Sequence, residues 1–250
     1  MGYPASVYDE DYHFRADGYA HWVKGKMRYG DALAAVVYAF GVPNWETIRD
    51  LFQCTQFGKE SDGDERTAWH QLNALMPLFA RTPKSVLDVG GGRGEVSLAF
   101  ERLGVAKVQS VEPHSKAVEW YGKTAKRLYS LEAVRDTFRL VHSPIPECLP
   151  YLELEDVDTV TVVETLEHVP EAAWAEFWAA AKPALQRNKG RLVVTNWLNY
   201  HPIEVTGEEH CRRVDDAVYD WLAQGGKVAF REGSHLVVDY GQVPQEAGGR

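Results

Sequence analysis

The sequence has few cysteines and no long apolar run. Its three cysteines, Cys54, Cys148 and Cys211, lie far apart and match no zinc-binding spacing or disulfide framework, so we interpret them as free thiols. No apolar stretch approaches the roughly 20 residues that a membrane-spanning helix requires. The N-terminus also has neither the basic nor the apolar region of a signal peptide. These absences predict a soluble, cytoplasmic protein with no membrane partner.

The sequence also lacks an excess of positive charge. Its 27 Lys and Arg residues face 36 Asp and Glu residues, which gives a formal net charge of −9. Capture of a long nucleic acid requires a basic face that displaces phosphate counterions. Two basic clusters lie on predicted helices, where such groups are usually solvated. They are Lys123, Lys126 and Arg127, and Arg212 and Arg213. We therefore expect a small molecule as the partner and no nucleic acid. The oligomeric state that we expect is a monomer or a homodimer.

Hydrophobic periodicity divides the chain near residue 85. After this point, short valine-rich runs alternate with longer amphipathic stretches, which is typical of strands and crossover helices in a parallel sheet. Before it, three helical patterns are separated by Gly41-Val42-Pro43 and by a polar segment at residues 58–63. We predict a helical cap over residues 1–84 and an α/β core over 85–250. The aromatic residues at the head of the cap either line a substrate pocket or anchor the segment on the core.

The core is predicted to be a doubly wound, seven-stranded, mostly parallel sheet. The linker Glu232-Gly233-Ser234 is too short for a crossover helix, so the sheet should end in an antiparallel hairpin. The expected strands are Ser85–Val89, Lys107–Val111, Phe138–Val141, Asp158–Val163, Arg191–Asn196, Val228–Arg231 and His235–Tyr240, with helices at 95–103, 115–130, 171–186 and 212–224.

A glycine-rich turn follows the first predicted strand. It reads Asp88-Val89-Gly90-Gly91-Gly92-Arg93-Gly94-Glu95, and glycine lets a chain bend sharply and lets a ligand touch the backbone. At the carboxyl end of the first strand of an open parallel sheet, such a turn is typical of a nucleotide site. The dinucleotide fingerprint fails, because its third glycine would fall at Glu95. An acid at Asp88 instead suits a cationic ligand such as S-adenosylmethionine and would repel a pyrophosphate.

The next two strand ends extend this site. Glu112 lies 18 residues after Gly94, where an acid in such folds accepts hydrogen bonds from ribose hydroxyls. Pro113 follows it directly. By the same topology, His142 and Ser143 at the end of the third strand should border the adenine.

Four motifs together resemble the class I S-adenosylmethionine-dependent methyltransferase superfamily. They are Leu87–Gly94, Val111–Pro113, Glu164–Pro170 and Gly190–Val194, and they cover roughly residues 84 to 200. One departure is Arg187-Asn188-Lys189-Gly190, where this superfamily often has Pro-Gly-Gly. The resemblance implies a Rossmann-like fold and a set of cofactor-binding residues, which are Asp88, Gly90, Gly91, Gly92, Gly94, Glu112, Pro113, His142, Ser143 and Glu164.

The segment Glu164-Thr165-Leu166-Glu167-His168 should lie where the methyl group is presented. Its ionisable groups either shape the loop locally or form a divalent metal site for Mg, Mn or Zn. In support of a metal site, this segment is similar to those of two groups of methyltransferases. One is the ubiquinone-pathway O-methyltransferases, and the other methylates the 2′-hydroxyl at the 3′ end of small RNAs. The RNA group adds a later histidine ligand, for which His210 is the candidate. Either His168 or His210 could instead act as a general base.

These observations predict transfer of a methyl group from S-adenosylmethionine to an oxygen or nitrogen of a small organic acceptor, with metal-assisted O-methylation as one form. Methylation of an RNA 3′ end is an alternative. A protein of the same fold that binds S-adenosylmethionine and performs a different reaction, or none, is another, because one fold hosts several chemistries.

Overall fold

The computed structural model describes residues 32, 34–41, 76–92, 94–115, 117–119, 121, 138–196 and 212–241. Most of the predicted cap lies outside these residues, and so does His210. Of the first 84 positions, residues 32 and 34–40 are helical, and Met76–Phe79 forms the short helix α4. The boundary at residue 84 therefore stays a prediction.

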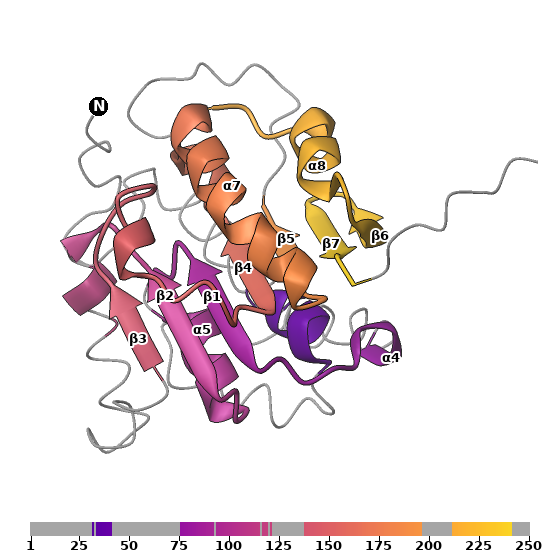
Figure 1. Ribbon diagram of the computed structural model, residues 1–250, viewed down its shortest axis with the longest axis horizontal. Helices are drawn as coiled ribbons and strands as arrows, with labels where there is room; N and C mark the ends of the chain where they lie inside the picture. The colour runs from indigo at the N-terminus through magenta and orange to yellow at the C-terminus, as the bar shows by residue number, and fades with distance from the viewer. Residues whose placement is uncertain are drawn as a thin grey trace, which may run out of the picture.

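The described strands form one seven-stranded sheet in the order β3-β2-β1-β4-β5-β7-β6 (Figure 1). Neighbours from β3 to β5 pair in parallel, whereas β7 is antiparallel to both β5 and β6. The predicted doubly wound, mostly parallel sheet with a terminal hairpin is confirmed. The strands are β1 (Ser85–Val89), β2 (Lys107–Val111), β3 (Phe138–Val141), β4 (Thr159–Val163), β5 (Arg191–Thr195), β6 (Lys227–Glu232) and β7 (His235–Asp239).

Helices cover both faces of the sheet (Figure 1). On one face lie α7 (Glu171–Arg187) and α8 (Asp216–Ala223), and on the other lie α5 (Glu95–Arg102) and the helical residues 34–40. Two short 3-10 helices, η2 (Leu149–Tyr151) and η3 (Leu166–His168), follow β3 and β4. The predicted helix 115–130 is described only at residues 115, 117–119 and 121, all of which are helical.

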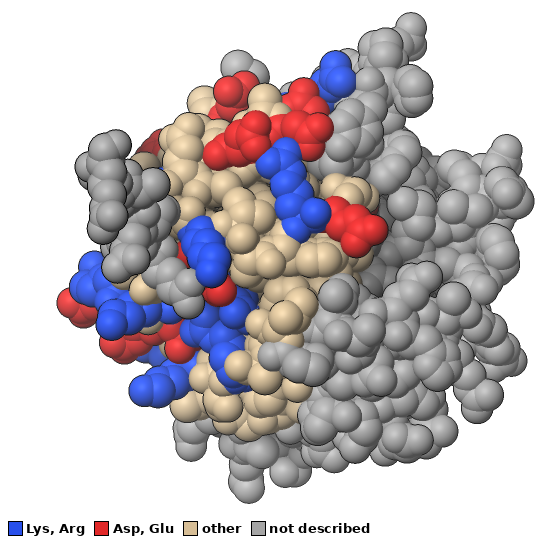
Figure 2. All heavy atoms as spheres, turned by 90° about the vertical axis from the view of Figure 1, so that its right-hand side faces the viewer, with Lys and Arg blue, Asp and Glu red and all other residues tan. Residues whose placement is uncertain are grey.

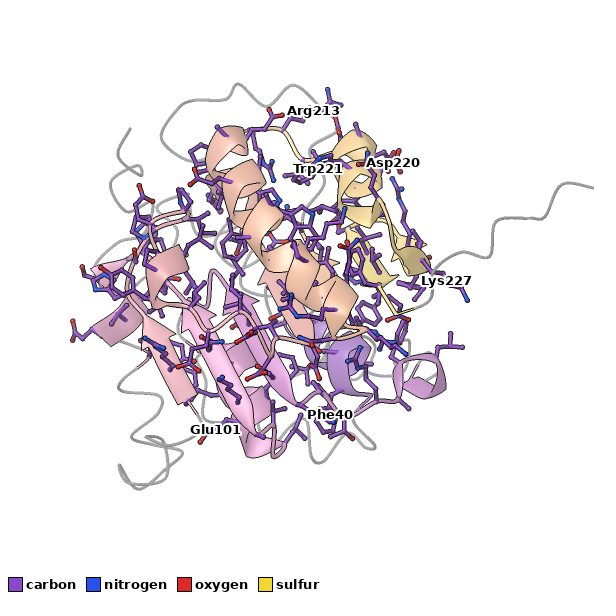
Figure 3. All side chains as sticks on the ribbon, in the orientation of Figure 1. Phe40, Glu101, Arg213, Asp220, Trp221 and Lys227 are labelled. Atoms are coloured by element: carbon purple, nitrogen blue, oxygen red, sulfur yellow. The ribbon has the colours of Figure 1, made fainter. Side chains whose placement is uncertain are left out.

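Each face of the sheet has its own apolar core, because successive side chains of a strand point to opposite faces. Leu87 packs against the face under α7 and α8, whereas Val86 packs against the other. On the first face, α7 contributes Trp174 and Phe177, both fully buried. Trp221 of α8 lies between α7 and α8 and is packed against this core (Figure 3). Burial of each such large side chain stabilises the fold by about 1.5–3 kcal/mol.

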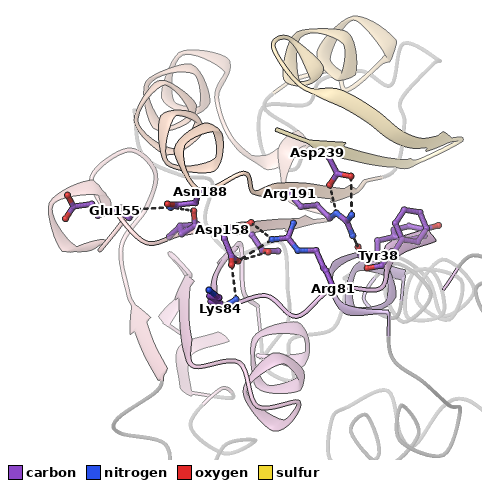
Figure 4. A network of polar contacts seen from close by, with 11 residues as sticks. Tyr38, Arg81, Lys84, Glu155, Asp158, Asn188, Arg191 and Asp239 are labelled. Carbon is purple, nitrogen blue, oxygen red and sulfur yellow. Dashed lines mark hydrogen bonds and ion pairs between the residues drawn. The ribbon is translucent and has the colours of Figure 1, made fainter. Parts of the chain in front are cut away.

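Buried polar contacts fasten the amino edge of the sheet (Figure 4). The Arg191 guanidinium donates to both carboxylate oxygens of Asp239, at 2.7 and 3.2 Å, and also to the carbonyls of Tyr38 and Phe79. Arg191 is only 6% exposed. It thereby ties β5 and β7 to the helical residues 34–40 and to α4. The network lies at the edge opposite the carboxyl ends of the strands, where ligands of such sheets bind.

The face that carries α8 and β6 mixes charges of both signs (Figure 2). Arg231 of β6 contacts the carboxylates of Asp216 and Asp220 on α8. The positive charge of Arg231 is therefore paired with negative charges on this face. Among the described helices, none combines the length and the apolar character that a bilayer crossing requires.

Candidate active site

The carboxyl ends of β1 to β5 bring the predicted site residues to one edge of the sheet. The ends of these strands lead into a glycine loop (Gly90–Gly94), Glu112, His142, a β4 loop (Glu164–His168), and Asn196. Because these strands are all parallel, their ends meet at the same edge. The topology therefore groups residues that are more than 100 positions apart in the sequence.

The glycine loop folds over the end of β2. The amides of Gly90 and Gly91 both donate to the carbonyl of Val111, each at 2.9 Å. Gly94 has a φ of 90°, in the left-handed region, and a Cβ there would lie 2.7 Å from the Tyr121 ring. Glycine is required at this position for both reasons. The loop then enters α5, whose start has no side-chain cap.

Asp88 lies beneath the glycine loop and is only 2% exposed. Its carboxylate accepts hydrogen bonds from the hydroxyls of Thr161 on β4, at 2.7 Å, and Ser97 on α5. These contacts join β1 to β4 and α5, which gives Asp88 a role in holding the loop. Its predicted attraction for a cationic ligand stays a prediction. The partners Ser97 and Thr161 give no signal in the sequence, because serine and threonine are common in helices and strands.

Glu112 contacts the glycine loop directly. Its Oε2 accepts the Gly92 N–H at 2.8 Å, and its Oε1 accepts the His114 N–H at 2.8 Å. The side chain is 3% exposed and is thus held in one orientation. A carboxylate has about four acceptor positions, so Glu112 can hold this turn and also accept ribose hydroxyls. The structure places the predicted ribose ligand and the predicted cofactor turn together.

His142 and Pro113, predicted from separate strand ends, are in contact. The His142 Nε2 lies 3.2 Å from the Pro113 carbonyl and 3.4 Å from the Ser115 hydroxyl. His142 is exposed, and Ser143 beside it is half-buried. These residues form the side of the site where the adenine was predicted.

His114 is a site residue that the sequence reasoning missed. It is half-buried, and burial is the main reason why its pKa lies below the ordinary value. The neighbouring imidazoles of His168 and His142 lower the pKa further, because a second positive charge nearby is unfavourable. Three imidazoles from the ends of β2, β3 and β4 are therefore neighbours. The signal was available, since His114 follows Glu112 by two residues at a strand end.

The β4 loop begins with Glu164, which is half-buried and has a φ of 46°. This left-handed backbone turns the chain back towards β1. The hydroxyl of the next residue, Thr165, lies 2.8 Å from the Val163 carbonyl and 3.2 Å from the Val89 carbonyl. Thr165 also fills the space that a side chain at Gly90 would need. The β4 loop and the glycine loop are thus packed against each other.

Glu167 and His168 end the β4 loop as an acid beside an imidazole. The Glu167 Oε1 lies 3.7 Å from the His168 Nε2, and the two side chains are 3% and 27% exposed. The Glu167 Oε2 is buried and has no hydrogen-bond partner among the described residues. A buried carboxylate oxygen without a donor is costly, which marks Glu167 as a group that a ligand could satisfy.

Arg212 was predicted to lie on a helix and to be solvated, but in the structure it precedes the helix and is half-buried. The helix α8 begins only at Asp216, because the Asp215 carboxylate accepts the amides of Ala217 and Val218 as its cap. Arg213 is exposed, but Arg212 is half-buried. The Arg212 Nε donates to the Leu166 carbonyl at 2.9 Å. A basic side chain therefore lies against the β4 loop.

The described residues do not form a metal site on their own. Within the described ranges, no group of three or more His, Cys, Asp or Glu side chains is arranged to hold an ion. Glu164, Glu167 and His168 therefore do not converge as three ligands. The fourth predicted ligand, His210, lies outside the described residues, as does its alternative role as a base.

Residues 63–236 match a family described as a methyltransferase domain. Similar solved structures include TehB from Haemophilus influenzae, which is 12% identical with a TM-score of 0.51 over 77% of this chain and 66% of that chain. The methyltransferase domain of a bacterial Hen1, CtHen1-C, is 20% identical with a TM-score of 0.46 over 71% and 96%. The C-terminal domain of precorrin-6Y C5,15-methyltransferase from Rhodobacter capsulatus is 22% identical with a TM-score of 0.36 over 53% and 64%.

The chain thus spans slightly less than two thirds of TehB and of the Rhodobacter domain. No curated protein matches it. At 12% identity and a TM-score of 0.51, TehB shows a shared fold and no more, while the family match covers well over half of the 250 residues. This match shows that the chain belongs to the methyltransferase domain family and contains an S-adenosylmethionine-dependent methyltransferase domain.

Proposed function

We propose that this enzyme transfers the methyl group of S-adenosylmethionine to an oxygen or nitrogen of a small organic acceptor. The observation that carries the proposal is the contact between Glu112 and Gly92, since Glu112 is the acid predicted to bind the ribose and it lies against the glycine loop. This contact supports a donor that lies across the ends of β1 and β2, with its sulfonium turned towards the β4 loop.

The chemistry requires two groups to be held close and in line. In the transfer step, the acceptor oxygen or nitrogen forms a bond to the methyl carbon, while the carbon–sulfur bond breaks and its electron pair stays on sulfur. Proximity and alignment supply most of the rate enhancement in such a displacement. The acceptor proton leaves to the His168 imidazole, which is partly exposed and lies beside the Glu167 carboxylate.

The size of the acceptor is inferred from charge. A net charge of −9 and the paired charges on the α8 face disfavour a long nucleic acid. Methylation of an RNA 3′ end would require tight, salt-dependent binding that these features do not support. A gel-shift assay at physiological salt, with single strands and duplexes, separates the two acceptor classes.

A metal-assisted form of the reaction would need Glu164, Glu167, His168 and His210 as ligands. The buried Oε2 of Glu167 supports it, whereas the failure of the three described residues to converge does not.

The deciding experiment is product analysis with S-adenosylmethionine carrying a labelled methyl group and a library of small hydroxyl and amine acceptors. Label in a small product, together with release of the demethylated donor, is the expected result. Donor binding without transfer to any acceptor would favour the alternative of a binding protein with the same fold.

A further inference from the structure

Asn196 lies at the end of β5 and is fully buried. Its side-chain Oδ1 accepts two backbone N–H groups of the β4 loop, that of Thr165 at 3.1 Å and that of Leu166 at 2.9 Å. These amides open the 3-10 helix η3, which has no side-chain cap of its own. Asn196 therefore caps this helix from a different strand, 30 positions away.

Asn196 is itself held from behind by two other elements. Its backbone N–H donates to the Ser234 carbonyl at 2.9 Å, in the turn between β6 and β7. The buried hydroxyl of Tyr219, on α8, lies 2.6 Å from the same Ser234 carbonyl and 3.3 Å from the Asn196 carbonyl. The carboxamide consequently projects from a backbone fixed by the hairpin and by α8.

The contacts continue from Asn196 to the donor side of the site. Thr165, whose amide Asn196 holds, places its hydroxyl 3.2 Å from the Val89 carbonyl and fills the space above Gly90. One chain of hydrogen bonds thus runs from the Ser234 turn through Asn196 and Thr165 to the start of the glycine loop. Buried chains of this kind rigidify the segments they join.

We propose that Asn196 is a positioning residue that fixes the β4 loop against the glycine loop and so sets where the bound methyl group faces the acceptor. This inference rests on the proposed function, because it places the donor in the glycine loop. The side chain of Asn196 holds the amides of Thr165 and Leu166 in the β4 loop, so its removal should change the geometry at the methyl group more than the affinity for the donor.

The test uses the full chain with three substitutions. Asn196→Ala removes both acceptor contacts, whereas Asn196→Asp keeps an oxygen that can accept the two amides. Val194→Ala is the matched control, because it removes volume from the same buried strand without removing a hydrogen bond to the loop. Three quantities are measured: hydrogen exchange at the Thr165 and Leu166 amides, the Kd of S-adenosylmethionine, and the NMR resonance of its ¹³C-labelled methyl group when bound.

For Asn196→Ala we expect exchange at the two amides to rise about tenfold or more, because their acceptor is lost. The bound methyl resonance should move, while the Kd changes by less than about threefold. Asn196→Asp should restore protection of the amides, and Val194→Ala should leave the methyl resonance in place. If Asn196→Ala does not fold, Thr165→Val breaks the next link in the chain and should move the methyl resonance in the same way.

Unchanged exchange in Asn196→Ala, or a methyl resonance that moves in neither Asn196→Ala nor Thr165→Val, overturns the role of Asn196. Failure of the proposed function is distinguishable from this result. A wild-type chain that does not bind S-adenosylmethionine overturns the function and this proposal together, whereas normal binding with unchanged exchange overturns only the proposal.

Discussion

The carboxylate of Glu112 accepts the backbone N–H of Gly92 at 2.8 Å across 20 positions of sequence. This single contact joins the end of β2 to the loop that follows β1. It holds an acid beside the glycine loop at the carboxyl edge of the sheet. In folds of this kind an acid at this position accepts hydrogen bonds from ribose hydroxyls.

The first prediction concerns donor affinity. Glu112→Ala should weaken S-adenosylmethionine binding by about 1–3 kcal/mol, because the charged hydrogen bonds to ribose and the support of the Gly92 turn are lost together. Calorimetry measures the effect, and the exposed Glu155→Ala is the control that should bind normally. Equal affinity of Glu112→Ala and wild type would remove Glu112 from the donor site.

The second prediction separates a buried ion pair from an exposed one. Arg191→Met should lower the free energy of unfolding by about 3–5 kcal/mol, because it leaves Asp239 and two buried carbonyls without their donor. Arg231→Ala removes exposed contacts and should cost about 0–1 kcal/mol. Urea unfolding compares the two variants. Similar losses in both would show that the network at the amino edge is not a main support of the fold.

The third prediction is a pH dependence that originates at His114. Its pKa is lower in the folded chain than in the unfolded chain. Below the ordinary His pKa of about 6.5, the unfolded chain therefore takes up this proton before the folded chain does. Stability from this group is complete above that value and falls as the pH drops towards the folded pKa. Urea unfolding between pH 5 and 7, roughly the range in which His titrates, gives the free energy of unfolding at each pH. This free energy should depend less steeply on pH in His114→Asn than in the wild type.

The fourth prediction concerns thiol reactivity. Burial raises the pKa of Cys148 to about 12, and the side chain is fully buried. Since the thiolate is the reactive form, an alkylating reagent at mildly alkaline pH should leave Cys148 unmodified in the native chain and label it in denaturant. Peptide mapping by mass spectrometry gives the site. Rapid labelling of Cys148 in the native chain would contradict its burial in the core.

The fifth prediction distinguishes a base from a metal ligand. His168→Ala should abolish or strongly reduce methyl transfer while donor binding persists, and chelator-treated enzyme should keep its activity. If chelation itself abolishes transfer, and Glu167→Ala does the same, the metal-assisted form is correct, because loss of one ligand commonly empties such a site. His210→Ala tests the remaining histidine under the same two conditions. Full activity of both histidine variants would assign these residues to loop structure.

The local hydrophobic pattern of the sequence was sufficient to predict the strands of the sheet. The predicted bounds of β1, β2 and β3 agree with the structure. For β1 and β2, which are buried parallel strands, Gly90 and Glu112-Pro113 mark the ends in the sequence. Glu112, His142 and the β4 loop were then predicted as parts of the site because each follows a strand, and parallel topology brings the carboxyl ends of the strands to one edge of the sheet.

The sequence by itself therefore determined the order of the strands and helices, the edge that carries the site and the class of ligand that the glycine loop receives. Only the tertiary structure decided that Asp88 is engaged by Ser97 and Thr161, that His114 neighbours His168, and that Asn196 caps a helix on another strand. These relations join residues that no sequence period connects. A hydrogen bond between distant side chains depends on packing, and periodicity reports only which face of an element is buried.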